Sequence, residues 1–334
     1  MSNLPAYIRF LMEGNAFPHS AADVKLVQTH ISYVVLAGDF VYKFKKPVDF
    51  GFLNFTTLEK RKYYCEQELV LNRRLCPSIY EGLVTINQDG DALSLNGSGD
   101  AIEYGIKMVR MPEERMMANV IKAGQLTEKM LDDIVDILAP FYEKADKAAA
   151  EFGTPESVAV NVLENFDQTR DFIGSDALSQ EQFDAISSYS RDFLAQSELF
   201  ARRINDGKIR DCHGDLYSAN ICLADHVYIY DCIEFNERFR YADVAADVAF
   251  MAMDLDFWHL EDLSRRFIDH FVEVSGDEGV RDMLDFYKCY RAYVRGKIGL
   301  FTAHAPEVDE AARQQALDQA GKYFDLALKY ATAS

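Results

Sequence analysis

The feature that most constrains the fold of this chain is a change of character near Pro112. Before this residue the apolar positions follow strand-like runs separated by turns, and after it they recur at helical spacing. A run of strands followed by a run of helices predicts an α+β fold, in which sheet and helices are segregated. The sequence therefore predicts two parts, residues 1–110 and residues 111–334.

The first part is expected to form an antiparallel sheet of about five strands with one inserted helix. Gly38-Asp39 lies between two β-rich runs and predicts a hairpin. Thr56 and Glu59 have the spacing of a capping box, which predicts a helix that ends near Leu75. The expected strands are 31–36, 40–45, 80–87, 92–95 and 102–111.

The second part is expected to be mostly helical, with one short β-rich interlude around residues 209–230. A short helix is also expected at the start of the chain, over residues 4–14. The helices expected in the second part are 127–150, 156–173, 179–206, 244–255, 259–274, 280–301 and 308–331.

Composition restricts the class of protein. The 334 residues are 49% hydrophobic, which predicts a folded globule. The net charge of −19 argues against a nucleic-acid partner, because a phosphate backbone requires a basic surface. Residues 1–110 carry 12 basic and 12 acidic residues, whereas residues 111–334 carry 23 and 42. The acidic second part favours a cationic ligand, although a solvated surface that maintains solubility explains the same charge.

The cysteines and the apolar runs indicate a cytoplasmic protein without a membrane partner. The six cysteines include no C-x-x-C pair, so neither a disulfide framework nor a zinc site is predicted. No apolar run approaches the roughly 18 residues of a membrane-spanning helix. The N-terminus also lacks the basic region and apolar core of a signal peptide.

The residues best suited to chemistry lie in the β-rich interlude. The run His213-Gly-Asp-Leu-Tyr-Ser-Ala-Asn220 is followed by Asp231 after the next apolar run. Its spacing matches H-x-D-L-x-x-x-N, in which the Asp receives the proton of an attacking hydroxyl and the Asn holds magnesium. In this pattern a second Asp on the next strand bridges metal and phosphates, so Asp215, Asn220 and Asp231 are the candidates. The structural alternative is an Asx-rich turn with local hydrogen bonds.

Together these features resemble the aminoglycoside phosphotransferase-like family, which has a protein-kinase-like fold of two lobes. The H-G-D loop and Arg240-Tyr-Ala-Asp-Val-Ala-Ala-Asp-Val-Ala249 are similar to its aminoglycoside phosphotransferase and choline kinase branch. Segments 29–32, 42–48 and 51–55 are similar to an uncharacterised bacterial branch. The resemblance implies a β-rich nucleotide-binding lobe, a larger helical lobe for catalysis and substrate, and ATP and Mg²⁺ as cofactors.

The fold requires a strand lysine that binds the nucleotide phosphates. Lys43 and Lys45 share a strand face with Val41, because alternate side chains point to the same side. The residue two positions before the lysine faces the adenine, so Lys43 is preferred, since it places the apolar Val41 there. Lys45 is the alternative, and two solvated edge lysines are the structural reading. The resemblance also assigns Met108 and Met111 to the nucleotide site.

The lysine in turn requires a helix glutamate as its partner. Glu68 lies on the buried stripe of the predicted helix with Leu71, whereas Glu66 lies among charged neighbours. A carboxylate on a buried face needs a partner, which Lys43 would supply. A surface ion pair of Glu68 with Arg61 is the alternative.

Three further polar residues lie on predicted helices of the second part. Asp247 occurs in an otherwise apolar run and is expected to brace the backbone of the 213–220 loop. Arg291 and Arg295 are one helical turn apart. A structural ion pair is the preferred reading for these arginines over binding of an anionic substrate group.

The resemblance implies an ATP- and Mg²⁺-dependent phosphotransferase acting on a hydroxyl of a small molecule, which the acidic charge suggests is cationic. Only eleven residues separate Asp231 from Asp243, which leaves no room for a long activation segment that binds peptides. The sequence lacks G-x-G-x-x-G, so a non-catalytic nucleotide-binding module is the alternative function.

Overall fold

The computed structural model describes residues 4–305 and 308–333, and the chain forms two compact units. One unit runs through Asn119 and includes Asn220–Glu237, and the other comprises Val120–Ala219 and the residues from Arg238 onward. The segment Asn220–Glu237, which lies within the part predicted to be helical, therefore belongs to the same compact unit as the sheet. We call the two parts the sheet unit and the helical unit.

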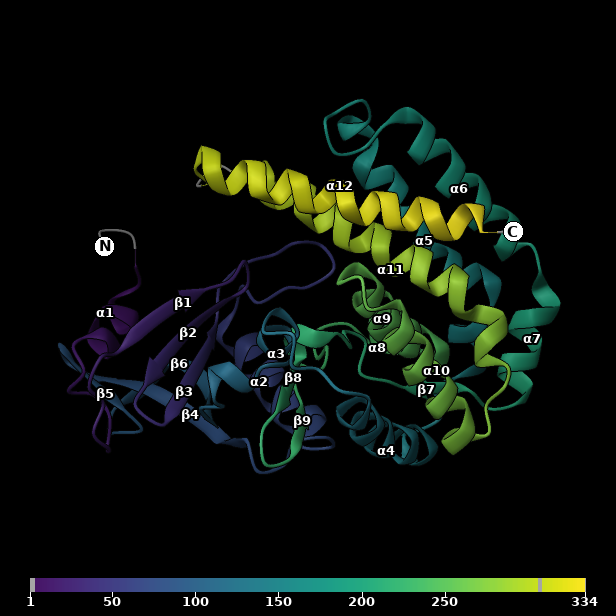
Figure 1. Cartoon of the computed structure of the whole chain (residues 1–334). Helices are drawn as coiled ribbons and strands as arrows, with labels where there is room; N and C mark the ends of the chain where they lie inside the picture. Colours follow the sequence, from purple (N-terminus) through teal and green to yellow (C-terminus); the bar gives the residue numbers. More distant parts are fainter. Residues whose placement is uncertain (1–3, 306–307, 334) are drawn as a thin grey trace. The chain divides into compact units, whose positions relative to one another are not determined.

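The sheet unit is built on six antiparallel strands in the order β1-β2-β3-β6-β4-β5 (Figure 1). The sequence predicted about five strands, and β1 is the additional one. Its side chains are mostly exposed, so it shows no clear apolar alternation, although it pairs with β2 along its whole length. The strands are β1 (Lys25–Gln28), β2 (Ser32–Ala37), β3 (Phe40–Lys45), β4 (Tyr80–Asp89), β5 (Ala92–Leu95) and β6 (Asp100–Val109).

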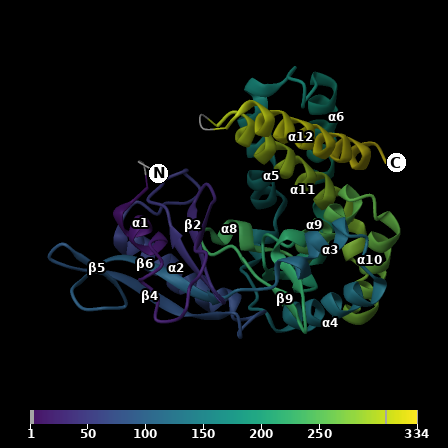
Figure 2. The same cartoon turned by 60° about the vertical axis from the view of Figure 1, so that its left-hand side comes forward.

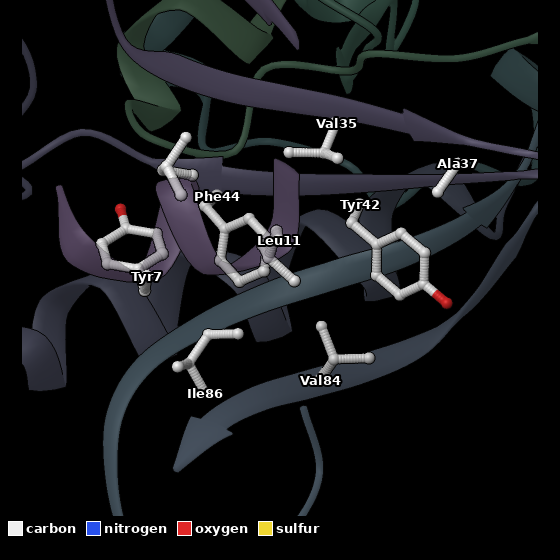
Figure 3. Close-up of a cluster of buried hydrophobic side chains, with 9 residues drawn as sticks. Tyr7, Leu11, Val35, Ala37, Tyr42, Phe44, Val84 and Ile86 are labelled. Atoms are coloured by element: carbon white, nitrogen blue, oxygen red, sulfur yellow. The ribbon is translucent and has the colours of Figure 1, made fainter. Parts of the chain in front are cut away.

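A short helix, α1 (Ala6–Met12), packs on one face of this sheet. Tyr7 and Leu11 of α1 lie in a buried apolar cluster with Tyr42 and Phe44 of β3 (Figure 3). Because alternate side chains of a strand point to opposite faces, this packing directs the odd-numbered residues of β3 to the other side of the sheet.

The second sheet helix is α2 (Leu58–Asn72), between β3 and β4 in the chain. Thr57 caps it, since its side chain accepts a hydrogen bond from the Lys60 amide. The capping residue predicted from the sequence, Thr56, was therefore one position too early. The helix buries Glu68 and Leu69, and Leu69 packs in an apolar cluster with residues of β4 and β6.

A hairpin from late in the chain completes the sheet unit. It consists of β8 (Ile221–Leu223) and β9 (Val227–Ile229) in antiparallel register. The Tyr230 amide donates to the Asn220 carbonyl at 3.0 Å. Since Asn220 directly precedes β8 and Asp231 lies two residues after the end of β9, the register brings both to the same end of the hairpin.

The helical unit is built around two long helices, α11 and α12, which lie side by side in Figure 1 and Figure 2. The almost wholly buried α9 packs against α10, α11 and α12. The predicted helix 179–206 is two helices, because the chain leaves the helical path near Gln196. The helices are α3 (Met117–Lys122), α4 (Glu128–Lys144), α5 (Pro155–Thr169), α6 (Gln180–Leu194), α7 (Ser197–Asn205), α8 (Glu237–Arg240), α9 (Val244–Phe257), α10 (Glu261–Ser275), α11 (Val280–Ala303) and α12 (Glu310–Thr332).

A small two-stranded sheet of β7 (Ile209–Asp211) and β10 (Tyr241–Asp243) lies beside these helices. Asp243 then caps α9, because its side chain accepts a hydrogen bond from the Ala245 amide. No helix in the described part of the chain combines the length and the apolar character that crossing a bilayer requires.

Candidate functional site

Two lysines of β3 and three carboxylates form a charge network in the sheet unit. Lys43 Nζ donates to Glu68 Oε1 at 2.8 Å and to Asp231 Oδ1 at 2.6 Å. Lys45 Nζ donates to Glu68 Oε2 at 2.7 Å and also to Glu234 Oε1. Each oxygen of Glu68 therefore accepts from a different lysine, and the Lys43–Glu68 contact expected from the sequence is present.

The network is buried at one end and accessible at the other. The side chain of Glu68 is 0% exposed, and those of Lys45 and Glu234 are 2% and 6% exposed. The Lys43 side chain is 17% exposed and that of Asp231 is 44% exposed. Lys43 and Asp231 are therefore the members that a ligand from solvent can reach, whereas Lys45 is enclosed.

The balance of burial and charge differs among these groups. Burial raises the pKa of the Glu68 carboxyl, but Lys43 and Lys45 outweigh it and lower the pKa to about 2. Burial raises the pKa of Glu234 above its ordinary value, against the charge of Lys45. Burial lowers the pKa of Lys43, but the charges of Asp231 and Glu68 outweigh it and raise the pKa. Glu68 and Lys43 are therefore charged at neutral pH.

We expect acid to destabilise the protein partly through Glu68. Because its pKa is depressed, ionised Glu68 stabilises the fold fully above about pH 4.5, and this stabilisation is lost as the pH falls toward 2. At 1.36 kcal/mol per unit, the loss is on the order of 3 kcal/mol. Urea unfolding between pH 5 and pH 2.5 should show a weaker pH dependence for Glu68→Gln than for the unmodified protein. Glu66→Gln, on the same helix and exposed, is the control, and equal pH dependence in all three proteins would refute this role.

Asp231 has an uncommon backbone conformation, with φ of +63°. Among non-glycine residues, aspartate is one of the few that tolerate this left-handed region. The Asp231 amide donates to Tyr80 Oη at 3.3 Å, and the Cys232 amide donates to Asn72 Oδ1 at 2.9 Å. Residues of β4 and α2 thus hold the turn after β9, and the Asp231 side chain points toward Lys43.

The candidate metal ligands have suitable chemistry for magnesium. Asn220 and Asp231 supply an amide oxygen and a carboxylate, which are hard oxygen donors of the kind that Mg²⁺ prefers. Among the described residues, no group of three or more His, Cys, Asp or Glu side chains is arranged to hold a metal. A site of few protein ligands is typical of magnesium that is also bound by substrate phosphates and water.

The three apolar residues assigned to the nucleotide are neighbours on the α2 side of the sheet. Val41 of β3 lies opposite Met108 of β6 in the strand register. Met108 belongs to the buried cluster below α2, and Val41 and Met111 pack against that cluster. Val41 and Lys43 are two residues apart on β3, so their side chains point to the same face of the sheet. The apolar surface and the exposed end of the charge network therefore lie on that face.

In the helical unit, Asp247 of α9 holds the start of the 213–220 loop. Its carboxylate accepts from the His213 amide at 2.7 Å and from the Gly214 amide at 3.0 Å. The side chain is fully buried and also accepts from Tyr142 Oη at 3.0 Å. These hydrogen bonds confirm the bracing role that the sequence predicted for Asp247.

The loop conformation depends on its first residues. Gly214 has φ of +88°, a region that favours glycine, which explains the G of the H-G-D run. The Asp215 amide donates to His213 Nδ1 at 3.2 Å, so the imidazole fixes the backbone that carries the Asp215 carboxylate. His213 is fully buried, which agrees with a structural role for its ring.

Sequence reasoning missed a second brace of this loop, Asp254. Its carboxylate accepts from the Ser218 amide at 2.9 Å, and burial raises its pKa against this hydrogen bond. Asp254 lies seven residues after Asp247, two turns along the same apolar helix. Residues seven apart share a helix face, so Asp254 could have been recognised from the sequence as a second acid on the face that carries Asp247.

No family model matches the chain. Relatives include uncharacterised proteins of Mycobacterium tuberculosis and Mycobacterium bovis, each 34% identical over 293 residues, which is 86% of this chain. The chain spans 57% of the length of these relatives.

Solved structures support a conclusion about the fold. A choline/ethanolamine kinase family protein from Mesorhizobium loti matches with a TM-score of 0.53 and 11% identity, over 98% of this chain and 99% of that one. A choline kinase from Streptococcus pneumoniae matches with a TM-score of 0.53 and 12% identity, over 96% and 99%. An amicoumacin kinase in complex with AMP-PNP, Ca²⁺ and Ami matches with a TM-score of 0.52 and 9% identity, over 96% and 94%. The chain has a protein-kinase-like fold.

The two-lobe α+β class predicted from the sequence is thereby confirmed. In this kinase-like fold the sheet unit contains Lys43, Glu68, Asn220 and Asp231, and the helical unit contains Asp215. The alternative partner for Glu68, Arg61, instead binds Glu103 at 2.8 Å.

Sequence reasoning missed Glu234 and treated Lys45 only as a substitute for Lys43. In the structure the two lysines act together, since both bind Glu68. The loop after β9 presents Asp231 and Glu234 to the two lysines, three residues apart in the chain. The sequence does contain a signal for this network. Two lysines occupy alternate positions of one predicted strand, and two acids follow shortly after the apolar run 227–230.

Proposed function

We propose that this chain is an ATP- and Mg²⁺-dependent phosphotransferase that transfers the γ-phosphate to a hydroxyl group of a small molecule. The observation that carries this proposal is the Lys43 ammonium held by both Glu68 and Asp231. Phosphoryl transfer by a protein kinase needs a strand lysine paired with a helix glutamate, together with an aspartate that binds the metal. The solved structures of similar fold that are named choline kinase and amicoumacin kinase support a small-molecule acceptor.

We assign nucleotide binding to the sheet unit. Lys43 binds phosphate oxygens while Glu68 fixes its position, and Val41, Met108 and Met111 contact the adenine. Asn220 and Asp231 would hold the magnesium ion. When bound, the ion neutralises the negative charge of the phosphates.

We assign acceptor chemistry to the helical unit, with Asp215 as the catalytic base. The acceptor oxygen forms a bond to the γ-phosphorus and loses its proton to the Asp215 carboxylate. The bond between the γ-phosphorus and the β–γ bridging oxygen breaks, and its electron pair leaves with ADP. Asp247 and His213 position the loop that carries Asp215.

Thermal denaturation and phosphate transfer test this proposal. ATP with Mg²⁺ should raise the melting temperature more than ATP with EDTA, because Asn220 and Asp231 bind the nucleotide only through the ion. Radiolabelled γ-phosphate should then pass to at least one member of a panel of small hydroxyl compounds, with ADP as the second product. Failure of ATP to raise the melting temperature under either condition would refute nucleotide binding. We expect the activity in the cytoplasm, as the cysteine content of the sequence predicts.

A non-catalytic nucleotide-binding module is the second candidate, and one observation favours it. The turn between β1 and β2 occupies the place of the glycine-rich loop that covers the nucleotide phosphates in kinases. In this turn the Ser32 and Ile31 amides donate to Thr29 Oγ1 at 2.9 and 3.3 Å. These amides are therefore already bonded within the chain, and the turn lacks the glycines that allow close approach to phosphates. Binding of Mg-ATP without turnover across the whole acceptor panel would favour this candidate.

A further inference from the structure

Three basic side chains of α11 in the helical unit differ in their partners. Lys288 Nζ donates to Asp256 Oδ2 at 2.9 Å, and Arg291 lies 3.8 Å from Asp247 Oδ1. Arg295, one turn further on, forms no ion pair with the acidic residues of 4–305 and 308–333. Its Nε is buried without a hydrogen-bond acceptor. The Arg295 side chain is partly buried, and a buried guanidinium N–H without an acceptor calls for a specific explanation.

Aromatic rings fix the position of Arg295. Its guanidinium lies over the Tyr217 ring at 4.9 Å and over the Tyr323 ring at 5.7 Å. Tyr217 in turn stacks on Phe250 at 5.3 Å, and Tyr323 stacks on Phe257 at 3.9 Å. Aromatic faces attract cations, and here the chain's own cation covers those of Tyr217 and Tyr323. A cationic ligand at this place would therefore be repelled by the Arg295 guanidinium, which already covers the faces of both tyrosine rings.

Arg295 lies close to the proposed catalytic loop. Tyr217, whose ring it covers, is two residues after Asp215, and Asp254 holds the next amide, that of Ser218. Burial lowers the pKa of Arg295, but the two tyrosines and Asp215 outweigh it and raise the pKa. Burial raises the pKa of Asp254, and the charge of Arg295 partly opposes this rise. Arg295 therefore interacts electrostatically with Asp215, the proposed base on this loop.

We propose that Arg295 binds an anionic group, a carboxylate or a phosphate, on the acceptor whose hydroxyl Asp215 deprotonates. This inference rests on the proposed function and specifies its substrate class as small hydroxy acids or phosphorylated polyols. A guanidinium presents parallel N–H groups that bind either anion through two hydrogen bonds. The tyrosines hold its plane, so little side-chain freedom is lost when the anion binds.

The cationic acceptor expected from composition and the ion pair preferred for Arg295 are therefore not part of this proposal. The charge of residues 111–334 is an average over a whole surface, and most of it is solvated. Among the acids of α9, Asp247 lies 3.8 Å from Arg291 and Asp256 accepts a hydrogen bond from Lys288, so the charges of these two are already compensated.

Acceptor pairs that differ in charge test the proposal directly. The pairs are D-glycerate and glycerol, glycerol 3-phosphate and glycerol, and glucose 6-phosphate and glucose, with choline and glucosamine as cationic acceptors. Initial rates of γ-phosphate transfer should be higher for the anionic member of at least one pair. Arg295→Gln should raise KM for that acceptor by about 10–100-fold, as expected for hydrogen bonds to a charged group, with a smaller effect on kcat.

Two further variants separate charge from geometry. Arg295→Lys should recover part of the loss in KM, since it keeps the charge but not the paired donors. Lys297→Gln, on the same helix, should leave KM unchanged, because Lys297 Nζ binds Gln168 at 2.7 Å, away from the proposed site. A neutral or cationic acceptor used best, with KM insensitive to Arg295→Gln, would overturn the anionic assignment and leave the phosphotransferase proposal intact.

A direct binding measurement decides the case if no acceptor is phosphorylated. Absence of turnover by the unmodified protein counts against the proposed function, not against an anion site. Inorganic phosphate, sulfate and D-glycerate should then raise the melting temperature of the unmodified protein and of Lys297→Gln but not of Arg295→Gln. No rise, or an equal rise in all three proteins, would overturn the proposal.

Discussion

Replacement of Asp215 by asparagine should lower the rate of phosphoryl transfer by about 10²–10⁴-fold, the usual contribution of a positioned general base. Asparagine has the same shape but cannot accept the proton of the acceptor hydroxyl. The loop should keep its conformation, because its bonds to Asp247 and His213 involve backbone amides and not the Asp215 carboxylate. Initial rates over a range of acceptor concentrations measure the effect, which should fall on kcat.

The same variant should leave Mg-ATP binding nearly unchanged, since the proposed nucleotide ligands are Lys43, Asn220 and Asp231. Asp225→Asn is the matched control, because Asp225 is an exposed aspartate in the turn of the β8–β9 hairpin. Retention of more than about a tenth of the rate by Asp215→Asn would exclude a general-base role of ordinary size.

Replacement of Lys45 by methionine should destabilise the protein by about 3–5 kcal/mol, the usual cost of breaking a buried ion pair. Lys45 is enclosed, so its loss leaves Glu234 buried without a cation. Replacement of Lys43 should cost less, because Lys45 still holds Glu68 and because Asp231 is half-exposed. Lys43→Met should instead abolish the rise in melting temperature that Mg-ATP produces in the unmodified protein.

Urea unfolding at neutral pH compares these variants with Lys60→Met, which removes an exposed lysine of α2. Addition of Glu234→Gln to Lys45→Met should restore part of the stability, since it removes the unpaired charge. Equal destabilisation by the two lysine variants, with equal loss of nucleotide binding, would contradict the separation of a structural Lys45 from a ligand-binding Lys43.

Local patterns predicted most of the fold. The turn residues Gly38-Asp39 predicted the hairpin, the capping motif predicted the helix that carries Glu68, and helical apolar spacing predicted the long α11, all of which the structure contains. Two errors arose where periodicity misled: β1 is mostly exposed, and the helical spacing of 179–206 continues across the break near Gln196. Apolar periodicity indicates which residues are buried, but it does not indicate whether they lie on one unbroken helix.

The Lys43–Glu68 contact was predictable because a carboxylate on a buried helix face needs a cation and β3 offers one. Glu234 was not, since it lies 189 positions from Lys45 and no local rule joins the two. The same holds for Arg295, whose rings come from the 213–220 loop and from α12. The chemical roles of Asp215, Asn220 and Asp231 stay predictions. The Asp215→Asn variant tests the first, and the Mg²⁺ dependence of the melting temperature with ATP tests the other two.

The sheet unit is assembled from two separate stretches of the chain, because it includes Asn220–Glu237. The polypeptide passes between the two units three times, so neither is a contiguous stretch of the gene. A truncated product ending at Asn119 would retain Lys43, Lys45 and Glu68 but would lack Asp231 and Glu234, leaving two interior cations with one anion. The N-terminal third of such a gene is therefore not expected to encode a self-sufficient nucleotide-binding module. Recombination that exchanged this third alone would leave its lysines without their acidic partners.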